Sequence, residues 1–242
     1  VNSQKTHMMY ALSDGCCYKV IACSSEAKAK QIYEEYRFLD AAISFYPAKD
    51  LLFYQADIRS KELVSQRMQV IQAVLKGEPI TVVDAFMDAL LPKEMIKSRV
   101  IKICSDETLN LDELSVKLAQ CGYDREIEVA GPGQFAVRGG ILDVYPLTEE
   151  LPVRIELWGD EVDSIRTFDP ETQRSIEKLD EVEVFPATEF PEEEEKRVSF
   201  LDYFEKENTI LFLDEPVRLK EKGEGVEEEF LEAQKRRAQS GY

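Results

Sequence analysis

The sequence has little histidine, no paired cysteines and no long apolar run. His7 is the single histidine in 242 residues, so His-based catalytic triads and multi-His metal sites have almost no material. The five cysteines are an odd number without a CxxC pair, which favours free thiols over a disulfide framework or a zinc site. No stretch approaches the roughly 18–20 apolar residues that span a bilayer, and no signal peptide is visible. We therefore expect a cytoplasmic chain with no membrane partner and no metal.

Positive charge is also scarce. The chain has 30 Lys and Arg against 48 Asp and Glu, a net charge of −18. The imbalance is uneven, with net charges of +1 over residues 1–99, −9 over 100–179 and −10 over 180–242. Because a phosphate backbone attracts clustered Lys and Arg, this composition argues against a broad nucleic-acid-binding surface but allows a local basic spot. A hydrophobic fraction of 44% is enough for a globular core.

The first part of the chain, residues 1–97, alternates helices with strands. We predict helices over 3–12, 24–39, 59–76 and 84–90, and strands over 18–23, 42–46 and 80–83. Ser25 and Glu26 are typical of a helix start, since a hydroxyl caps free amides and an acid suits the helix dipole. Strands that alternate with helices predict a parallel sheet.

The pattern changes over residues 98–190. We predict a helix over 109–120 and strands over 98–103, 126–130, 134–137, 141–145, 153–157, 161–168 and 181–186. Strands joined by short glycine turns predict an inserted α+β domain with an antiparallel sheet. Residues 191–242 are predicted to begin with a linker and return to the first region through a short helix, a strand and a long charged helix, at 199–204, 209–213 and 216–238.

Two short motifs bear on nucleotide binding. Lys5 and Thr6 fit the last two positions of a G-x-x-x-x-G-K-[ST] phosphate loop, but Gln4 stands at the second glycine position. Its side chain occupies a position where the backbone must approach phosphate closely. An ordinary capped helix accounts for the same residues.

The second motif, Asp214-Glu215, follows an apolar strand, as the magnesium-binding acids of P-loop ATPases do. Pro216 and Val217 come next, so the fourth position of a helicase-type tetrad has no polar group. An acidic cap on the last helix, with proline in its first turn, explains these residues equally well.

Strand alternation identifies a different candidate surface. Within 153–158 it places Arg154, Glu156 and Trp158 on one face and the aliphatic residues on the other. The single tryptophan is thereby predicted on the solvated face with an arginine, and both residue types are enriched in interface hot spots. Arg138 lies among glycine turns in the same acidic region. An arginine lying over a partly buried Trp158 is an alternative of comparable weight.

The stretch from Gly133 to Pro191 closely resembles the bacterial transcription-repair coupling factors (Mfd), in the part of their N-terminal module that is similar to UvrB. RGGILDVYP and DSIRTFDPETQRS carry the strongest similarity. Weaker collinear similarity reaches both ways, through FYP, DIRS and Arg67 on one side and LFLDEPVRLKE on the other. The resemblance therefore covers nearly the whole chain.

This resemblance implies an α/β fold in which a degenerate P-loop, helicase-type lobe (1–97 and 191–242) is interrupted by an inserted UvrA-binding domain (98–190). Arg138, Arg154 and Trp158 match the two arginines and the aromatic residue, commonly Phe, that contact UvrA in the family. A damaged ATP site is a family feature that fits Gln4. The run between Tyr46 and Lys61 is too short for the DNA-gripping hairpin of UvrB, which favours a coupling factor.

Three functions follow as hypotheses. The preferred one is a UvrA-recruiting module with no catalytic residue and no cofactor; ATP and Mg would belong to the motor domains of a longer parent protein, an ATP-dependent DNA translocase. RNA polymerase and double-stranded DNA would bind elsewhere on that parent, and the Val at the first position agrees with a piece of a longer chain. The alternatives are an active UvrB-type ATPase on damaged DNA, using Lys5, Thr6, Asp214 and Glu215, and an autoinhibitory or scaffolding domain.

Overall fold

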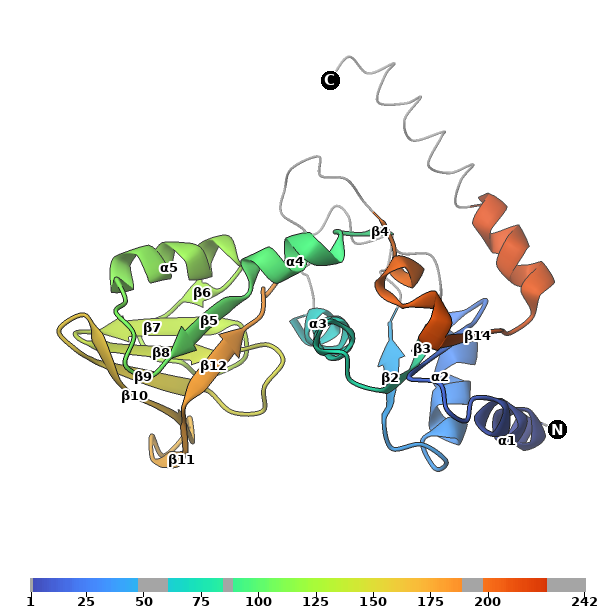
Figure 1. Cartoon of the computed structure of the whole chain (residues 1–242), viewed down its shortest axis with the longest axis horizontal. Coiled ribbons are helices and arrows are strands. Elements are labelled where there is room, and N and C mark those ends of the chain that lie inside the picture. The colour runs from blue at the N-terminus through green and yellow to red at the C-terminus, as the bar shows by residue number, and fades with distance from the viewer. Residues whose placement is uncertain (1, 48–60, 85–88, 189–197, 226–242) are drawn as a thin grey trace, which may run out of the picture. The chain divides into compact units, whose positions relative to one another are not determined.

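The structure, a computed structural model, describes residues 2–47, 61–84, 89–188 and 198–225 (Figure 1). The chain divides into two compact units. Unit 1 contains Val1–Asp50, Gly77–Ala89 and Ser199–Tyr242, and unit 2 contains Leu51–Lys76 and Leu90–Val198. The mixed α/β class is confirmed, whereas the predicted boundaries at 97/98 and 190/191 stay predictions.

A parallel sheet forms the centre of unit 1, with strands in the order β14-β1-β3-β2. The strands are β1 (Tyr18–Ala22), β2 (Ile43–Tyr46), β3 (Ile80–Asp84) and β14 (Thr209–Leu213). All four strands were predicted to within about two residues. β14 pairs with β1 from Tyr18↔Thr209 to Ala22↔Leu213, so the late segment completes the sheet that the first part begins.

Two helices cover one face of this sheet, α1 (Asn2–Leu12) and α2 (Glu26–Tyr36). Met9, Ile32 and Tyr36 from these helices join a buried cluster that includes Ile21 and Val83 of the sheet. α2 begins as predicted, because the Ser25 hydroxyl accepts a hydrogen bond from the backbone N–H of Lys28.

The opposite face of the sheet is covered by the 3₁₀ helix η2 (Phe200–Tyr203). Strand alternation turns Tyr46 away from the face that the two helices cover, and its ring stacks on Phe200 with centroids 4.1 Å apart. A second 3₁₀ helix, η3 (Lys206–Asn208), leads into β14. Residues 216–225, which follow β14, are helical.

Unit 2 is built on a sheet with strands in the order β11-β10-β9-β8-β7-β6. These strands are β6 (Asp124–Arg125), β7 (Gln134–Arg138), β8 (Ile141–Tyr145), β9 (Val153–Trp158), β10 (Glu161–Phe168) and β11 (Ser175–Leu179). Neighbours are antiparallel except for β6 and β7. The predicted antiparallel sheet is therefore confirmed.

One face of this sheet is apolar and covered. Helix α5 (Leu111–Gln120) and the antiparallel pair β5 (Ile101–Cys104) and β12 (Glu181–Val184) contribute to the buried cluster on that face. Asn110 caps α5 by accepting from two backbone amides. Unit 2 also contains α3 (Lys61–Lys76) and α4 (Lys93–Arg99).

Some local predictions are wrong. Residues 126–130 were expected to form a strand, but the side-chain oxygen of Gln134 accepts from the amides of Ala130 and Gly131 and holds this segment as a loop. The strand predicted to begin at Ser98 begins at Ile101, because α4 continues to Arg99. β11 was not predicted, since its mostly exposed residues have no apolar alternation and it forms by pairing with β10.

The short helix predicted over 84–90 is also wrong where it can be tested. Residues 85–88 lie outside the described residues, and Ala89–Leu90 is a short strand, β4. A second two-residue strand, β13, spans Val198–Ser199, whereas the predicted linker at 191–195 lies outside the described residues. No helix in the described ranges is long and apolar enough to cross a membrane.

Candidate functional site

The face of the unit 2 sheet opposite its core carries the predicted arginines and tryptophan. On β9, Val153 and Ile155 are buried in the core, so alternation directs Arg154 and Trp158 to the other face. The predicted separation of the two faces is confirmed. Trp158 is 85% exposed, and the alternative of an arginine over a partly buried Trp158 is therefore wrong.

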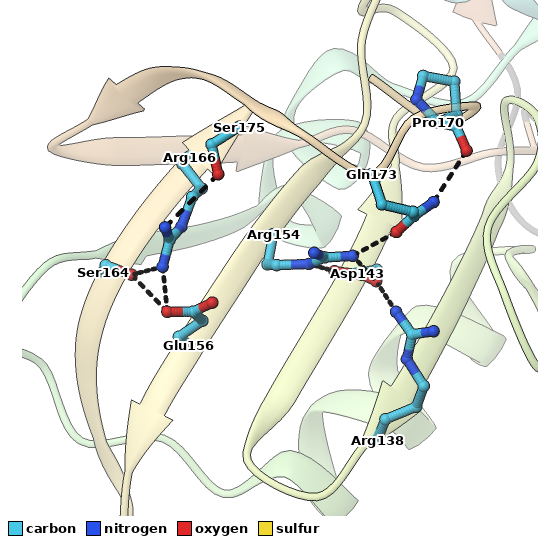
Figure 2. A network of polar contacts seen from close by, with 9 residues as sticks. All are labelled: Arg138, Asp143, Arg154, Glu156, Ser164, Arg166, Pro170, Gln173 and Ser175. Atoms are coloured by element: carbon cyan, nitrogen blue, oxygen red, sulfur yellow. Dashed lines mark hydrogen bonds and ion pairs between the residues drawn. The ribbon is translucent and has the colours of Figure 1, made fainter. Parts of the chain in front are cut away.

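A buried carboxylate, which the sequence analysis did not single out, brings the two arginines together. Asp143 lies on β8, the strand between β7 and β9, and its side chain is only 1% exposed. Arg154 donates from Nε to Oδ1 at 2.7 Å and from Nη2 to Oδ2 at 2.8 Å, and Arg138 donates from Nη2 to Oδ2 at 2.7 Å. Figure 2 shows both guanidinium groups directed at Asp143.

Arg154 is held by more than its ion pair. Its guanidinium carbon lies 4.4 Å from the ring centroid of Phe168, and its Nη2 also donates to Gln173 at 2.7 Å. Gln173, whose φ is 59°, donates in turn to the carbonyl oxygen of Pro170. Hydrogen bonding to Asp143 raises the pKa of Arg154, against the opposing effect of burial. The group is thus a fixed cation with only 15% of its side chain exposed.

Arg138 is the more accessible cation, with 43% of its side chain exposed. It ends β7, directly before the turn formed by Gly139 and Gly140. Gly139 has a φ of 61°, and a Cβ on Gly140 would lie 2.9 Å from the backbone oxygen of Leu157. The two glycines therefore let this turn pack closely against β9 beside Trp158, which places Arg138 and Trp158 at the same end of the sheet.

A second ion pair lies on the neighbouring part of this face. Arg166 on β10 pairs with Glu156 on β9, and Ser164 contacts both side chains (Figure 2). The sequence analysis missed this pair and Gln173, together with Asp143. Only Asp143 had a sequence signal, since a lone acid between Leu142 and Val144 of an apolar strand calls for a cationic partner.

The predicted nucleotide-site residues lie in unit 1. Lys5 of α1 forms an ion pair with Asp214, which follows β14 and is completely buried. The Oδ2 atom of Asp214 has no hydrogen-bond partner in the described part of the chain. Thr6 is buried, and Glu215 accepts from Ser24 and Arg218. The structure thus brings Lys5 and Asp214 together and directs Glu215 to other groups.

Comparison with known proteins agrees with the sequence resemblance. Residues 101–190 match the family described as "UvrB interaction domain". The transcription-repair-coupling factor of Bacillus subtilis (strain 168) is 41% identical over 169 residues, which cover 67% of this chain and 14% of that protein. The corresponding factor of Staphylococcus haemolyticus (strain JCSC1435) is 39% identical over 148 residues, covering 60% and 13%.

A third relative, the transcription-repair-coupling factor of Staphylococcus aureus (strain Mu50 / ATCC 700699), is 35% identical over 158 residues, covering 64% of this chain and 13% of that protein. The resemblance of the chain to the N-terminal, UvrB-like module of these factors is thereby confirmed. The matched part of the chain spans only 13–14% of the length of these relatives.

Proposed function

We propose that this chain is the UvrB-like module through which a transcription-repair coupling factor recruits UvrA, in transcription-coupled nucleotide excision repair. The observation that carries the proposal is one sheet face on which Arg138 and Arg154 meet at Asp143 and Trp158 is exposed. The match of residues 101–190 to the UvrB interaction domain supports it, because all of these residues lie within that range.

The chemistry of this face suits a protein partner. Arg138 offers a charge-assisted contact of defined direction, since arginine forms forked hydrogen bonds with carboxylates. Trp158 exposes a large ring that a partner can bury at low cost in side-chain entropy. Arg154 is largely enclosed, so it would contribute to binding through its charge and by holding Asp143 and Gln173 in place.

The test is the affinity of purified UvrA for the chain and for Arg138→Ala, Arg154→Ala and Trp158→Ala, measured by calorimetry. We expect each variant to lose about 2 kcal/mol or more, roughly 30-fold in Kd, if its residue is a hot spot. Val116→Ala is a matched control, because Val116 is exposed on α5, which covers the other face of the sheet. Wild-type affinity in all three site variants would refute the proposal.

We further propose that the nucleotide site of unit 1 does not function. The ammonium group that would neutralise phosphate is already paired with Asp214, and Gln4 stands where a phosphate loop needs glycine. The chain itself would then be no enzyme and hold no cofactor. In the parent protein, a cytoplasmic ATP-dependent DNA translocase, the motor domains would bind ATP and Mg, and other parts would contact RNA polymerase and double-stranded DNA.

The competing function, an active UvrB-type ATPase on damaged DNA, is favoured by one observation, the proximity of Lys5 and Asp214. Titration of the chain with Mg-ATP distinguishes the two. We expect no heat of binding at micromolar concentrations. Micromolar binding that Lys5→Ala abolishes would favour the ATPase.

A further inference from the structure

The position of Asp143 in the sheet explains how two arginines from different strands reach one carboxylate. Asp143 is directly opposite Ala136 on β7 and Arg154 on β9. Arg138 lies two residues beyond Ala136, and a diagonal neighbour at this spacing is within reach of a long side chain. Arg138 and Arg154 therefore reach Asp143 from the two strands that flank β8.

The two arginines depend on Asp143 to different degrees. Arg154 has further partners in Gln173 and Phe168. For the Arg138 side chain, the single hydrogen bond found in the described part of the chain is the one to Asp143. Asp143 is therefore the group that orders Arg138, an otherwise long and mobile side chain.

We propose that Asp143 is the positioning residue of the partner-binding face: by fixing Arg138 on the face that also exposes Trp158, it prepares this face for an acidic surface of UvrA. This inference rests on the proposed function and deepens it. Asp143 itself is too buried to touch a partner. It acts through Arg138, whose remaining N–H donors stay available.

The charge balance of the face indicates that its partner is acidic. Asp143 neutralises one of the two arginines, so the group keeps one positive charge. Glu156 and Glu128 also lie near Arg154 and help to raise its pKa, but Glu156 is itself paired with Arg166, and the described ion pair of Arg138 is with Asp143. The exposed, oriented guanidinium of Arg138 would bind a carboxylate on the partner and repel other cations.

If Asp143 positions Arg138, removing its charge should weaken UvrA binding; if it acts only as a counter-charge, removing its charge should strengthen binding. The two explanations can therefore be separated by experiment. Asp143→Asn adds one unit of positive charge to the face; if Asp143 acted only as a counter-charge, binding of an acidic partner would tighten. We expect the opposite, a loss of about tenfold in UvrA affinity by calorimetry. Asp163→Asn, an exposed site on β10, makes the same charge change and should leave Kd within about twofold.

A second variant and a double-mutant cycle separate positioning from loss of fold. Asp143→Glu keeps the charge but moves the carboxylate by one methylene group, and it should also weaken binding about tenfold. In an Arg138→Ala background, Asp143→Asn should have little further effect, because the two residues act as one unit. Wild-type or tighter binding by Asp143→Asn, or full additivity in the cycle, would overturn the inference.

A measurement on the free wild-type chain needs neither UvrA nor a variant. The ¹H–¹⁵N NOE of the Arg138 Nε–Hε group should indicate an ordered side chain, similar to Arg154. A freely moving Arg138 would overturn the inference while leaving the proposed function intact. Failure of the wild-type chain to bind UvrA would instead overturn the proposed function, and this inference with it.

Discussion

Asp143 in unit 2 and Asp214 in unit 1 are both buried carboxylates that meet cations, yet they have opposite consequences for the surface. Asp143 receives two arginines, one of which keeps 43% of its side chain exposed, so a positive charge remains at the surface. Within the described ranges, the ion pair of Asp214 is with Lys5, and this pair is neutral although 41% of the lysine side chain is exposed. Under the proposed function, the first site would present charge to a partner, and the second would keep its lysine from binding phosphate.

The difference arises from where each carboxylate lies in its sheet. Asp143 lies on β8, which is flanked by β7 and β9, so long side chains can reach it from both neighbouring strands. Asp214 lies beyond the end of β14, where its backbone N–H donates to Ala22, and the described contact to its side chain comes from α1. The position of each acid in its sheet therefore decides how many cations it meets, and with them the net charge of its surroundings.

Asp143→Ala should have the largest effect on stability. It leaves the enclosed Arg154 without a counter-charge, and breaking a buried pair in this way typically costs about 3 kcal/mol or more. Urea denaturation followed by circular dichroism measures the loss. Asp163→Ala is the control and should change the free energy of unfolding by less than about 0.5 kcal/mol. Equal losses in the two variants would show that the carboxylate of Asp143 does not hold the arginines.

Lys5→Met should have the next largest effect. It leaves Asp214 completely buried without its cation, and we expect a loss of about 2 kcal/mol, less than for a fully enclosed pair because Lys5 itself is partly exposed. Lys30→Met is the matched control, since Lys30 makes an exposed ion pair with Glu26 that should contribute about 0.5 kcal/mol or less. A loss at Lys5 no greater than at Lys30 would contradict the contrast between the two buried acids.

Much of unit 2 could be predicted from local sequence. β8 and β10 were predicted with their observed ends, because apolar alternation and glycine turns mark them on both sides. The same alternation placed Arg154 and Trp158 on the open face. These features depend on neighbours within about ten residues, and this is the range over which strand periodicity is informative.

The polar network could not be predicted in the same way. Asp143 accepts from arginines five and eleven residues away, on two other strands, so its role depends on the register of the sheet. Gln173 reaches Arg154 from a left-handed backbone conformation that its sequence does not signal. In an acid-rich region, spacing alone does not distinguish the one acid that organises the face from the many that are solvated.

Arg138→Ala sharpens the comparison by separating binding from stability. Asp143 keeps Arg154 when Arg138 is removed, so the exposed half of the network should contribute less than about 1 kcal/mol to folding. The same variant is expected to lose UvrA binding. Urea denaturation beside the calorimetric Kd measures both effects, and a stability loss matching that of Lys5→Met would mean that Arg138 serves folding rather than a partner.

Trp158→Ala should have the smallest effect on stability. The side chain is 85% exposed, so its removal exposes little apolar surface and should change the free energy of unfolding by no more than about 0.5 kcal/mol. The expected loss of UvrA affinity would then not come from lost stability. A ring that is mostly exposed in the free chain can become buried when a partner binds. A substantial loss of stability would show that Trp158 serves folding, and Arg138 would then remain as the accessible partner contact on this face.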